Sequence, residues 1–411
     1  MSEVQPGLFY VLNIQSGAVI SAVNTAGSFK QVHAFPSSNN NHVLTMVQGA
    51  NTTLYGAGFS IAGFYYYSIA TSGTGLQEYP FPGQSPSQWG SLNETLLAPP
   101  GEFYDLASTY VGGTQVFGLA KIQETGQITI LHQMTPAEGY PGINTALTLG
   151  PGGNLYDIGT EQPEGISANF IFSFTPTGAY SRIAKLPAPA GEGGDLLPLI
   201  GASDGTLYGS IAHGGSNNTG EIYQATTSGQ VQIVASFPAS GMQKPWTLMQ
   251  AADGNIYGST INNTAGTSWI FRYDPRTKRL TQLYELNGSQ GLCNCNLQEG
   301  MDGKIYGVTP RGGPSPGAGA IFSLDIGLPK PLPQVQGLYP PSGVVGQKVI
   351  LWGNYLLGAT AVSFNGTPAT TFLSTSKQSV QATVPAGATT GPVTVTTANG
   401  SFTTTQSFTV Q

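Results

Sequence analysis

Asp204-Gly-Thr-Leu-Tyr-Gly209 recurs with small changes as Asp253-Gly-Asn-Ile-Tyr-Gly258 and as Asp302-Gly-Lys-Ile-Tyr-Gly307. Weaker versions of the phrase occur upstream, so that seven tyrosines mark seven copies: Tyr10, Tyr55, Tyr104, Tyr156, Tyr208, Tyr257 and Tyr306. Successive tyrosines are 45, 49, 52, 52, 49 and 49 residues apart. Because a four-stranded propeller blade takes roughly 40–50 residues, this period predicts a β-propeller of about seven blades.

Each copy can be divided into four strands. In the fifth copy these are Leu197–Ile200, Tyr208–Ile211, Gly220–Ala225 and Val231–Phe237, with turn residues between them. An Asp-Gly pair suits the tight hairpin between the first two strands, since Gly tolerates positive φ and Asp can bond the turn backbone. We therefore expect Asp204, Asp253 and Asp302 to serve the turns rather than a carboxylate site.

Both ends of the repeat region are incomplete. The first copy lacks a leading strand before Leu8, and the seventh stops after Ile321-Phe-Ser-Leu324. Propellers normally complete one blade from both chain ends, since open strand edges invite aggregation. We expect the propeller to occupy residues 1–327, with a blade left short at each terminus.

The repeated phrases resemble the Gly-rich tandem repeat nicknamed GloVer, which occurs in exported proteins of soil and aquatic bacteria. Tyr208-Gly, His213-Gly-Gly and Gly220-Glu-Ile-Tyr223 match its pattern, as do Tyr306-Gly, Arg311-Gly-Gly and Gly319-Ala-Ile-Phe322. The resemblance covers about residues 8–327. It implies the propeller architecture and carries no biochemical activity with it.

A second domain follows a Pro-rich linker, residues 328–333, which we expect to be extended and stiff. Residues 334–411 alternate apolar residues with regularly spaced turns, which predicts a β-sandwich of about seven strands. Tyr339-Pro-Pro-Ser-Gly343, Gly346–Tyr355 and Gly391–Thr397 resemble the immunoglobulin-like IPT/TIG domain. That resemblance implies a spacer or interaction module. We expect Trp352 to pack inside the sandwich or against the propeller.

Composition agrees with an all-β chain and excludes several functions. The chain has 57 Gly and 29 Pro, and only 8% of its residues are charged. A net charge of −6 and 14 scattered Lys and Arg argue against nucleic acid and anionic membranes as partners. No run of eighteen apolar residues occurs, so we expect no membrane insertion. We expect a secreted or cell-surface protein whose signal peptide is absent from this chain.

Groups for metal binding or catalysis are few. Cys293 and Cys295 form either a local disulfide or two free thiols, and they are too few for a zinc site. Asp105 and Asp157 replace the Gly after the marker tyrosine in adjacent copies, so a calcium site or an acid pair there is an alternative. Otherwise we expect no cofactor, no metal and no catalytic residue.

Binding residues are better supplied. In propellers of this strand order, the loops between the second and third strands and the loops between blades lie on one face. Exposed aromatic side chains beside amides and charges suit sugars. Phe64-Tyr-Tyr-Tyr67 lies either in such a loop or in a strand. The candidate ligand-binding residues are Trp89, Tyr140, Asp195, His213, Lys244, Trp246 and Arg311.

Three functions are compatible with this pattern. The leading hypothesis is an extracellular recognition or structural protein that binds a glycan or an extracellular protein through the loop face. A secreted polysaccharide lyase or glycoside hydrolase is the second, with a channel site built from Asp105, Asp157, Glu221, His213 or Arg311. The third is a self-assembling surface protein that associates through unpaired blade edges or the sandwich.

Overall fold

The fold is entirely β in the part of the chain that the structure describes. In this computed structural model the only other regular element there is a short 3₁₀ turn, η2 (Pro151–Gly153). The expected all-β class is thus confirmed. The described residues are 1–13, 18–35, 42–49, 51–60, 63–83, 90–91, 95–99, 101–142, 145–161, 169–186, 196–261, 266–287, 290, 293, 295–309, 319–374 and 376–411.

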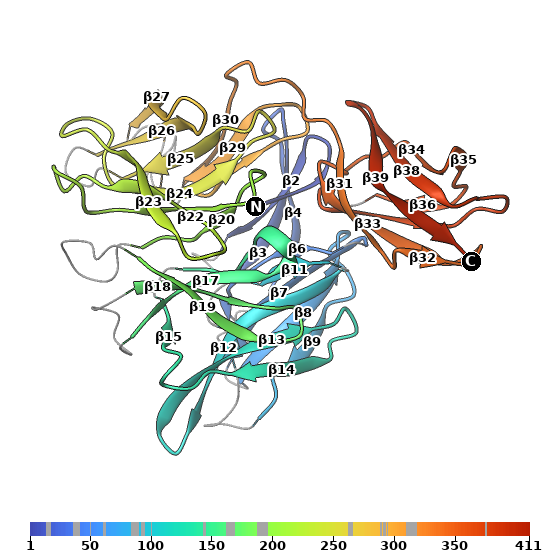
Figure 1. Ribbon diagram of the computed structural model, residues 1–411, viewed down its shortest axis with the longest axis horizontal. Helices are drawn as coiled ribbons and strands as arrows, with labels where there is room; N and C mark the ends of the chain where they lie inside the picture. Colours follow the sequence, from blue (N-terminus) through green and yellow to red (C-terminus); the bar gives the residue numbers. More distant parts are fainter. Residues whose placement is uncertain are drawn as a thin grey trace.

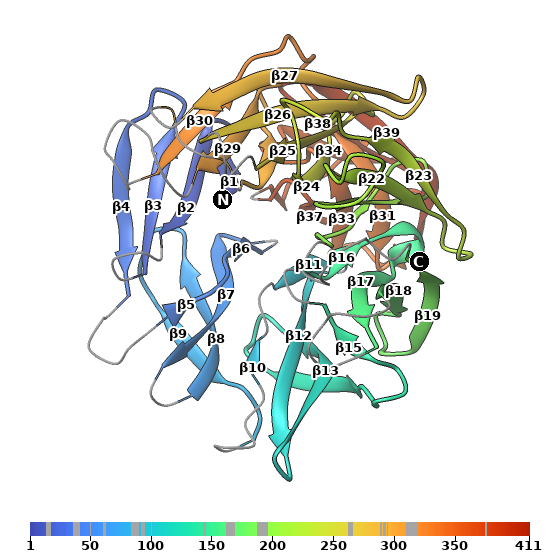
Figure 2. The same ribbon diagram turned by 90° about the vertical axis from the view of Figure 1, so that its left-hand side faces the viewer.

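Seven antiparallel sheets follow one another along residues 2–324 of the described chain. Figure 2 shows them set around a common centre, in a propeller-like arrangement that we call the wheel. In the second, third and fourth sheets the innermost strand is split into two short pieces. The strands, sheet by sheet, are β1 (Ser2–Gln5), β2 (Leu8–Asn13), β3 (Val19–Asn24) and β4 (Phe29–Ala34); β5 (His42–Val43), β6 (Val47–Gln48), β7 (Thr53–Ser60), β8 (Gly63–Ala70) and β9 (Gln77–Pro80); β10 (Gly90–Ser91), β11 (Leu96–Ala98), β12 (Glu102–Val111), β13 (Thr114–Ile122) and β14 (Ile128–Gln133); β15 (Tyr140–Pro141), β16 (Thr148–Leu149), β17 (Leu155–Thr160), β18 (Asn169–Phe174) and β19 (Tyr180–Lys185); β20 (Ile200–Gly201), β21 (Leu207–Ile211), β22 (Glu221–Ala225) and β23 (Val231–Ser236); β24 (Pro245–Gln250), β25 (Ile256–Thr260), β26 (Thr267–Asp274) and β27 (Arg279–Asn287); and β28 (Leu297–Glu299), β29 (Ile305–Thr309) and β30 (Ala320–Leu324).

The repeated phrase builds a turn that ties each marker tyrosine to its aspartate. Asp204 accepts a hydrogen bond from the Thr206 amide at 3.0 Å and another from the Tyr208 hydroxyl at 2.9 Å. Asp253 and Asp302 bond Tyr257 and Tyr306 in the same way, at 2.9 and 2.7 Å. The prediction that these carboxylates serve the turns is confirmed.

The glycine after the marker tyrosine makes room for an aromatic ring. Gly209 lies opposite Tyr223 on β22, and a Cβ atom on Gly209 would come within 2.2 Å of the Tyr223 hydroxyl oxygen. Gly258 faces Phe271 on β26 in the same way, at 2.4 Å. These rings are fully buried and belong to apolar clusters that join neighbouring sheets. The repeat therefore holds the wheel together mainly through packing between sheets.

The two ends of the wheel meet, and one end differs from expectation. Ser2–Gln5 supplies the leading strand of the first sheet, so the prediction that the first copy lacks this strand is wrong. The sequence pattern does not predict this strand because its inward-facing residue is the charged Glu3, which is 3% exposed. Glu3 accepts hydrogen bonds from the Met301 amide of the seventh sheet, and Phe9 packs on Tyr306 with ring centroids 4.2 Å apart.

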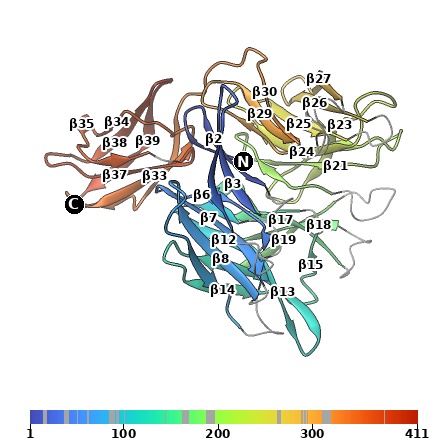
Figure 3. The same ribbon diagram turned by 180° about the vertical axis from the view of Figure 1, so that it is seen from behind.

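Residues 334–411 form two sheets packed over one apolar core, which we call the C-terminal sandwich. Figures 1 and 3 show it to one side of the wheel, and in Figure 2 it lies behind. One sheet has the order β31 (Gln334–Tyr339), β33 (Lys348–Asn354), β37 (Ser379–Thr383) and β36 (Phe372–Leu373). The other has the order β32 (Ser342–Gly343), β39 (Gly400–Val410), β38 (Gly391–Thr397), β34 (Ala361–Phe364) and β35 (Thr367–Pro368).

Candidate functional site: a cavity between the wheel and the C-terminal sandwich

A cavity of about 780 Å³ lies where the inner strands of the wheel face the C-terminal sandwich. Its wheel side comes from β6, β11, β16, β20, β24 and the turns that follow several of these strands. Its other side comes from β31, β33 and the residue before β37. Ligand pockets typically measure about 300–1,000 Å³, so this cavity has the size of a small-molecule site.

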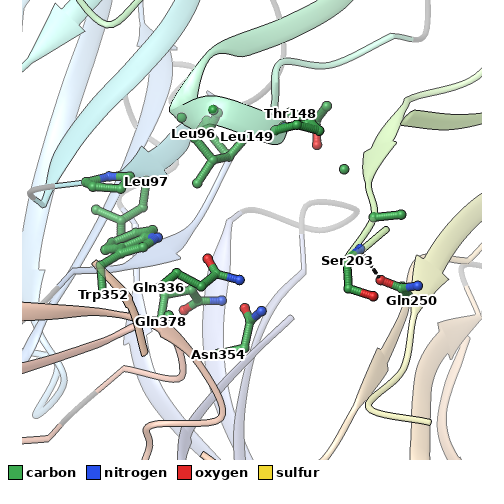
Figure 4. A pocket seen from close by; sticks show the side chains of 18 of the residues that line it. Leu96, Leu97, Thr148, Leu149, Ser203, Gln250, Gln336, Trp352, Asn354 and Gln378 are labelled. Atoms are coloured by element: carbon green, nitrogen blue, oxygen red, sulfur yellow. Dashed lines mark hydrogen bonds between the residues drawn. The ribbon is translucent and has the colours of Figure 1, made fainter. Parts of the chain in front are cut away.

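The sandwich contributes a group of three amide side chains. Figure 4 shows Gln336, Asn354 and Gln378 gathered on one side of the cavity. The side chains of Gln336 and Asn354 make no hydrogen bond to any described residue, whereas Gln378 Oε1 accepts one from Ser376 at 3.0 Å. Primary amides offer both donors and acceptors. This wall can therefore bond a ligand that carries hydroxyl groups.

The wheel contributes backbone, apolar side chains and one fixed amide. The glycine-rich turn after β16, residues 150–153, brings main chain to the cavity, and Leu96 and Leu149 supply apolar surface. Gln250 is held in place because its Oε1 accepts a bond from the Ser203 amide at 2.8 Å and its Nε2 donates to Gly254 at 3.0 Å. The cavity thus combines polar and apolar walls.

The described lining residues carry no formal charge at neutral pH. The lining includes Thr95, whose hydroxyl donates to the carboxylate of Asp105 at 3.3 Å, but Asp105 itself is 0% exposed and stands behind the wall. A general acid or base must reach the reacting atoms, and none of the described lining residues is a carboxylic acid, histidine or lysine. The arrangement is suited to binding an uncharged polar molecule.

Trp352 fixes one corner of the cavity. It is 3% exposed and packs in an apolar cluster with Tyr55, Leu97 and Phe103 of the second and third sheets. Of the two arrangements expected for Trp352, inside the sandwich or against the propeller, the structure shows the packing against the wheel. Its ring edge lines the cavity beside Leu97 (Figure 4).

A buried polar junction holds the sandwich in place. It consists of Glu3, Glu299, Tyr355 and Lys377, which come from the first sheet, the seventh sheet and the sandwich. Lys377 pairs with Glu3 at 3.4 Å and donates to the Glu299 carbonyl, while Tyr355 donates to the Glu299 carboxylate. The cavity wall is thereby anchored to the two sheets where the wheel closes.

Burial raises the pKa of Glu299 above its ordinary value. Hydrogen bonds from Tyr355 and the Ala252 amide and the charge of Lys377 act in the opposite direction, but desolvation prevails. Burial also raises the pKa of Tyr355, so its hydroxyl stays a donor. The junction therefore contains a carboxylic acid that ionises less readily than a free glutamate.

The predicted ligand residues lie away from this cavity. Lys244 directly precedes β24 and Trp246 is its second residue, whereas its last residue, Gln250, lines the cavity, about 13 Å from Trp246 along an extended strand. The loop that carries His213 is next to them, because the Lys244 amide donates to Thr219 at 2.7 Å and Ser210 donates to the Trp246 carbonyl at 2.6 Å. Tyr140 packs separately, edge-on against Phe117.

The structure describes some of the remaining predicted residues and not others. Trp89, Asp195 and Arg311 lie outside the described residues. Asp157 is 1% exposed and its carboxylate accepts a bond from the Ile158 amide, and in the described part of the chain no three His, Cys, Asp or Glu side chains gather as a metal site. Phe64–Tyr67 belongs to the strand β8. Cys293 and Cys295 form a disulfide.

Sequence reasoning missed Gln336, Asn354 and Gln378. The first two occupy exposed positions of strands β31 and β33, where a polar residue is ordinary on a solvent-facing side. Their approach to Gln250 depends on how the sandwich docks on the wheel. No local pattern carries that information.

The fold and the repeated phrase define a propeller-like repeat protein. Residues 194–408, just over half of the chain, match the model of the Gloeobacter/Verrucomicrobia repeat. The chain belongs to this repeat family. The match begins in the fifth copy and extends into the sandwich, whereas the resemblance seen in the sequence covers residues 8–327.

Solved structures support the propeller-like fold at low sequence identity. A puromycin hydrolase matches with a TM-score of 0.54 and 13% identity, over 85% of this chain and 59% of that one. A prolyl endopeptidase matches with a TM-score of 0.50 and 12% identity, over 97% and 54%.

This chain spans less than two thirds of the hydrolase and the endopeptidase, so the similarity concerns fold alone. No curated protein matches the sequence. No described helix is long and apolar enough to cross a membrane.

Proposed function

We propose that this chain is an extracellular or cell-surface recognition protein that binds a neutral glycan. In this proposal the seven sheets are the blades of a closed propeller, and the sandwich is an IPT/TIG-like domain that completes the binding site. The observation that carries the proposal is the uncharged cavity of about 780 Å³, lined jointly by both parts and by the amides of Gln336, Asn354, Gln378 and Gln250.

Sugar chemistry matches these walls. A pyranose has hydroxyl groups that both donate and accept hydrogen bonds, and it has a less polar face that packs on apolar side chains. The amides supply the first kind of contact, while Leu96, Leu149 and the edge of Trp352 supply the second. Anionic ligands fit less well, because no described lining residue is positively charged.

The disulfide supports the extracellular part of the proposal. Cys293 and Cys295 are the only cysteines in the chain, and they are joined. Disulfides persist in oxidising compartments such as the periplasm and the cell exterior. A free-thiol assay on protein purified from the native compartment would contradict this part if both cysteines were reduced.

A glycan array probed with the full chain tests the ligand class. We expect binding to neutral glycans, and a loss of affinity of at least about tenfold in Asn354→Ala combined with Gln336→Ala, since each lost hydrogen bond costs about 1 kcal/mol. Both side chains are exposed and make no described hydrogen bonds, so the melting temperature should not change.

Trp246→Ala is the matched control, because Trp246 lies near the other end of β24 from Gln250, which lines the cavity. If it abolished glycan binding while the double variant did not, the site would be on the loop face with Tyr140, His213 and Lys244. Absence of binding to any glycan would discard the ligand class. Release of reducing ends or unsaturated products from polysaccharides would show an enzyme instead.

A further inference from the structure

The seventh sheet ends one strand earlier than the other six sheets, so that its third strand, β30, forms the outer edge. In each of the first six sheets a further strand pairs with the strand equivalent to β30: β4, β9, β14, β19, β23 or β27. In the seventh, β30 is the last strand, and no described residue pairs with its outer edge. The chain then continues as Asp325-Ile-Gly-Leu-Pro-Lys-Pro, whose prolines cannot form a central strand.

The missing strand leaves apolar side chains incompletely covered. Phe322 faces Gly307 just as Tyr223 faces Gly209 and Phe271 faces Gly258. Tyr223 and Phe271 are both 0% exposed, whereas Phe322 is only half-buried. Its neighbours Ile321 and Leu324 are half-buried as well. An added strand would complete the burial that the equivalent positions already have.

The open edge also lacks the residues that normally protect strand edges. Charged side chains and proline discourage pairing between chains. Four of the other six outer strands carry such charges, for example Lys30 on β4, Arg182 on β19 and Arg279 on β27, whereas β14 and β23 carry none but pair with a complete sheet. The sequence of β30 is Ala-Ile-Phe-Ser-Leu, which contains neither charge nor proline.

We propose that β30 pairs with β30 of a second copy of this chain. Two identical antiparallel strands related by a two-fold axis satisfy each other's backbone groups, and a closed dimer results. Because the edge is uncharged, two copies meet there without the like-charge repulsion expected between two β4 or two β19 edges. The pairing joins two three-stranded sheets into one sheet, and it is independent of the glycan site.

Sedimentation velocity of the full chain over a wide concentration range tests this inference. We expect a reversible dimer of the wild type and a monomer of Ser323→Lys at the same concentrations. Ser323 is exposed and is the fourth of the five residues of β30, so the substitution adds a charge to the pairing edge of each copy without disturbing the core. Gln232→Lys, on the exposed outer strand β23, is the control and should dimerise like the wild type.

Hydrogen exchange gives a second readout. The amides of Ile321 to Leu324 should exchange more slowly as the protein concentration rises, and only in variants that dimerise. A wild type that stays monomeric, a dimer that survives Ser323→Lys, or a loss of dimer in Gln232→Lys would overturn the proposal.

Discussion

Asp204 and Tyr208 show why the repeated phrase keeps both residues. The aspartate accepts from the turn backbone and from the tyrosine hydroxyl at once, so it closes the hairpin and orients the ring that packs between sheets. Burial raises the pKa of Tyr208, and the neighbouring Asp204 carboxylate raises it further. The hydroxyl therefore remains a donor at every physiological pH.

Substitutions at Asp204 and Tyr208 should have non-additive effects on the free energy of unfolding. We expect Tyr208→Phe to lower the free energy of unfolding by about 1 kcal/mol, and Asp204→Ala by somewhat more, because the Thr206 amide also loses its acceptor. The double variant should cost clearly less than the sum of the two. Urea unfolding of the four proteins measures this, and strictly additive losses would mean that the two residues act separately.

At the scale of the element, the strand β28 ends in Glu299, whose pKa is raised by burial. A raised folded pKa gives stability that is complete below the ordinary value of 4.5 and is lost as the pH rises through the folded value. Lys377, Glu3, Tyr355 and Asp253 are the other titratable groups around it.

The stability of Glu299→Gln relative to the wild type should therefore increase as the pH increases. The difference in the free energy of unfolding between variant and wild type should be larger at about pH 7 than at about pH 4. Urea unfolding at both pH values checks this. Glu285→Gln, on the exposed side of β27, is the control for the loss of one acidic group; a difference for Glu299→Gln that stays constant with pH would contradict a raised pKa of Glu299.

The sequence predicts those elements whose pattern depends on residues close together in the chain. The tyrosine period marks the sheets and the Asp-Gly pairs mark the hairpins, since turn chemistry depends on adjacent residues. The strand β1 is missed because Glu3 replaces an apolar residue at an inward position. The cavity is missed because Gln336 and Gln250 meet only through docking of the sandwich, which depends on contacts such as Lys377 with Glu3.

At the scale of the whole molecule, one ion pair connects the first strand with the last domain. Glu3 is almost fully buried, and Lys377 is its cationic partner at 3.4 Å. Lys377→Met should leave that carboxylate buried and unpaired, at a cost of roughly 3–5 kcal/mol in the free energy of unfolding. Hydrogen exchange in β1 should accelerate in parallel.

Two comparisons make the test specific. Lys348→Met removes an exposed lysine on β33 of the C-terminal sandwich and should cost little. Glu3→Gln combined with Lys377→Met should restore part of the lost stability, because no uncompensated charge remains. A double variant no more stable than Lys377→Met alone would show that the lysine acts through packing.

The contact between Glu3 and Lys377 also sets an order of events during synthesis. Lys377 follows Glu3 by 374 residues, so at about 5–20 residues per second the ribosome takes tens of seconds to supply the lysine after Glu3 has been made. Throughout that interval β1 can pair with β2, but the buried Glu3 carboxylate lacks its cationic partner.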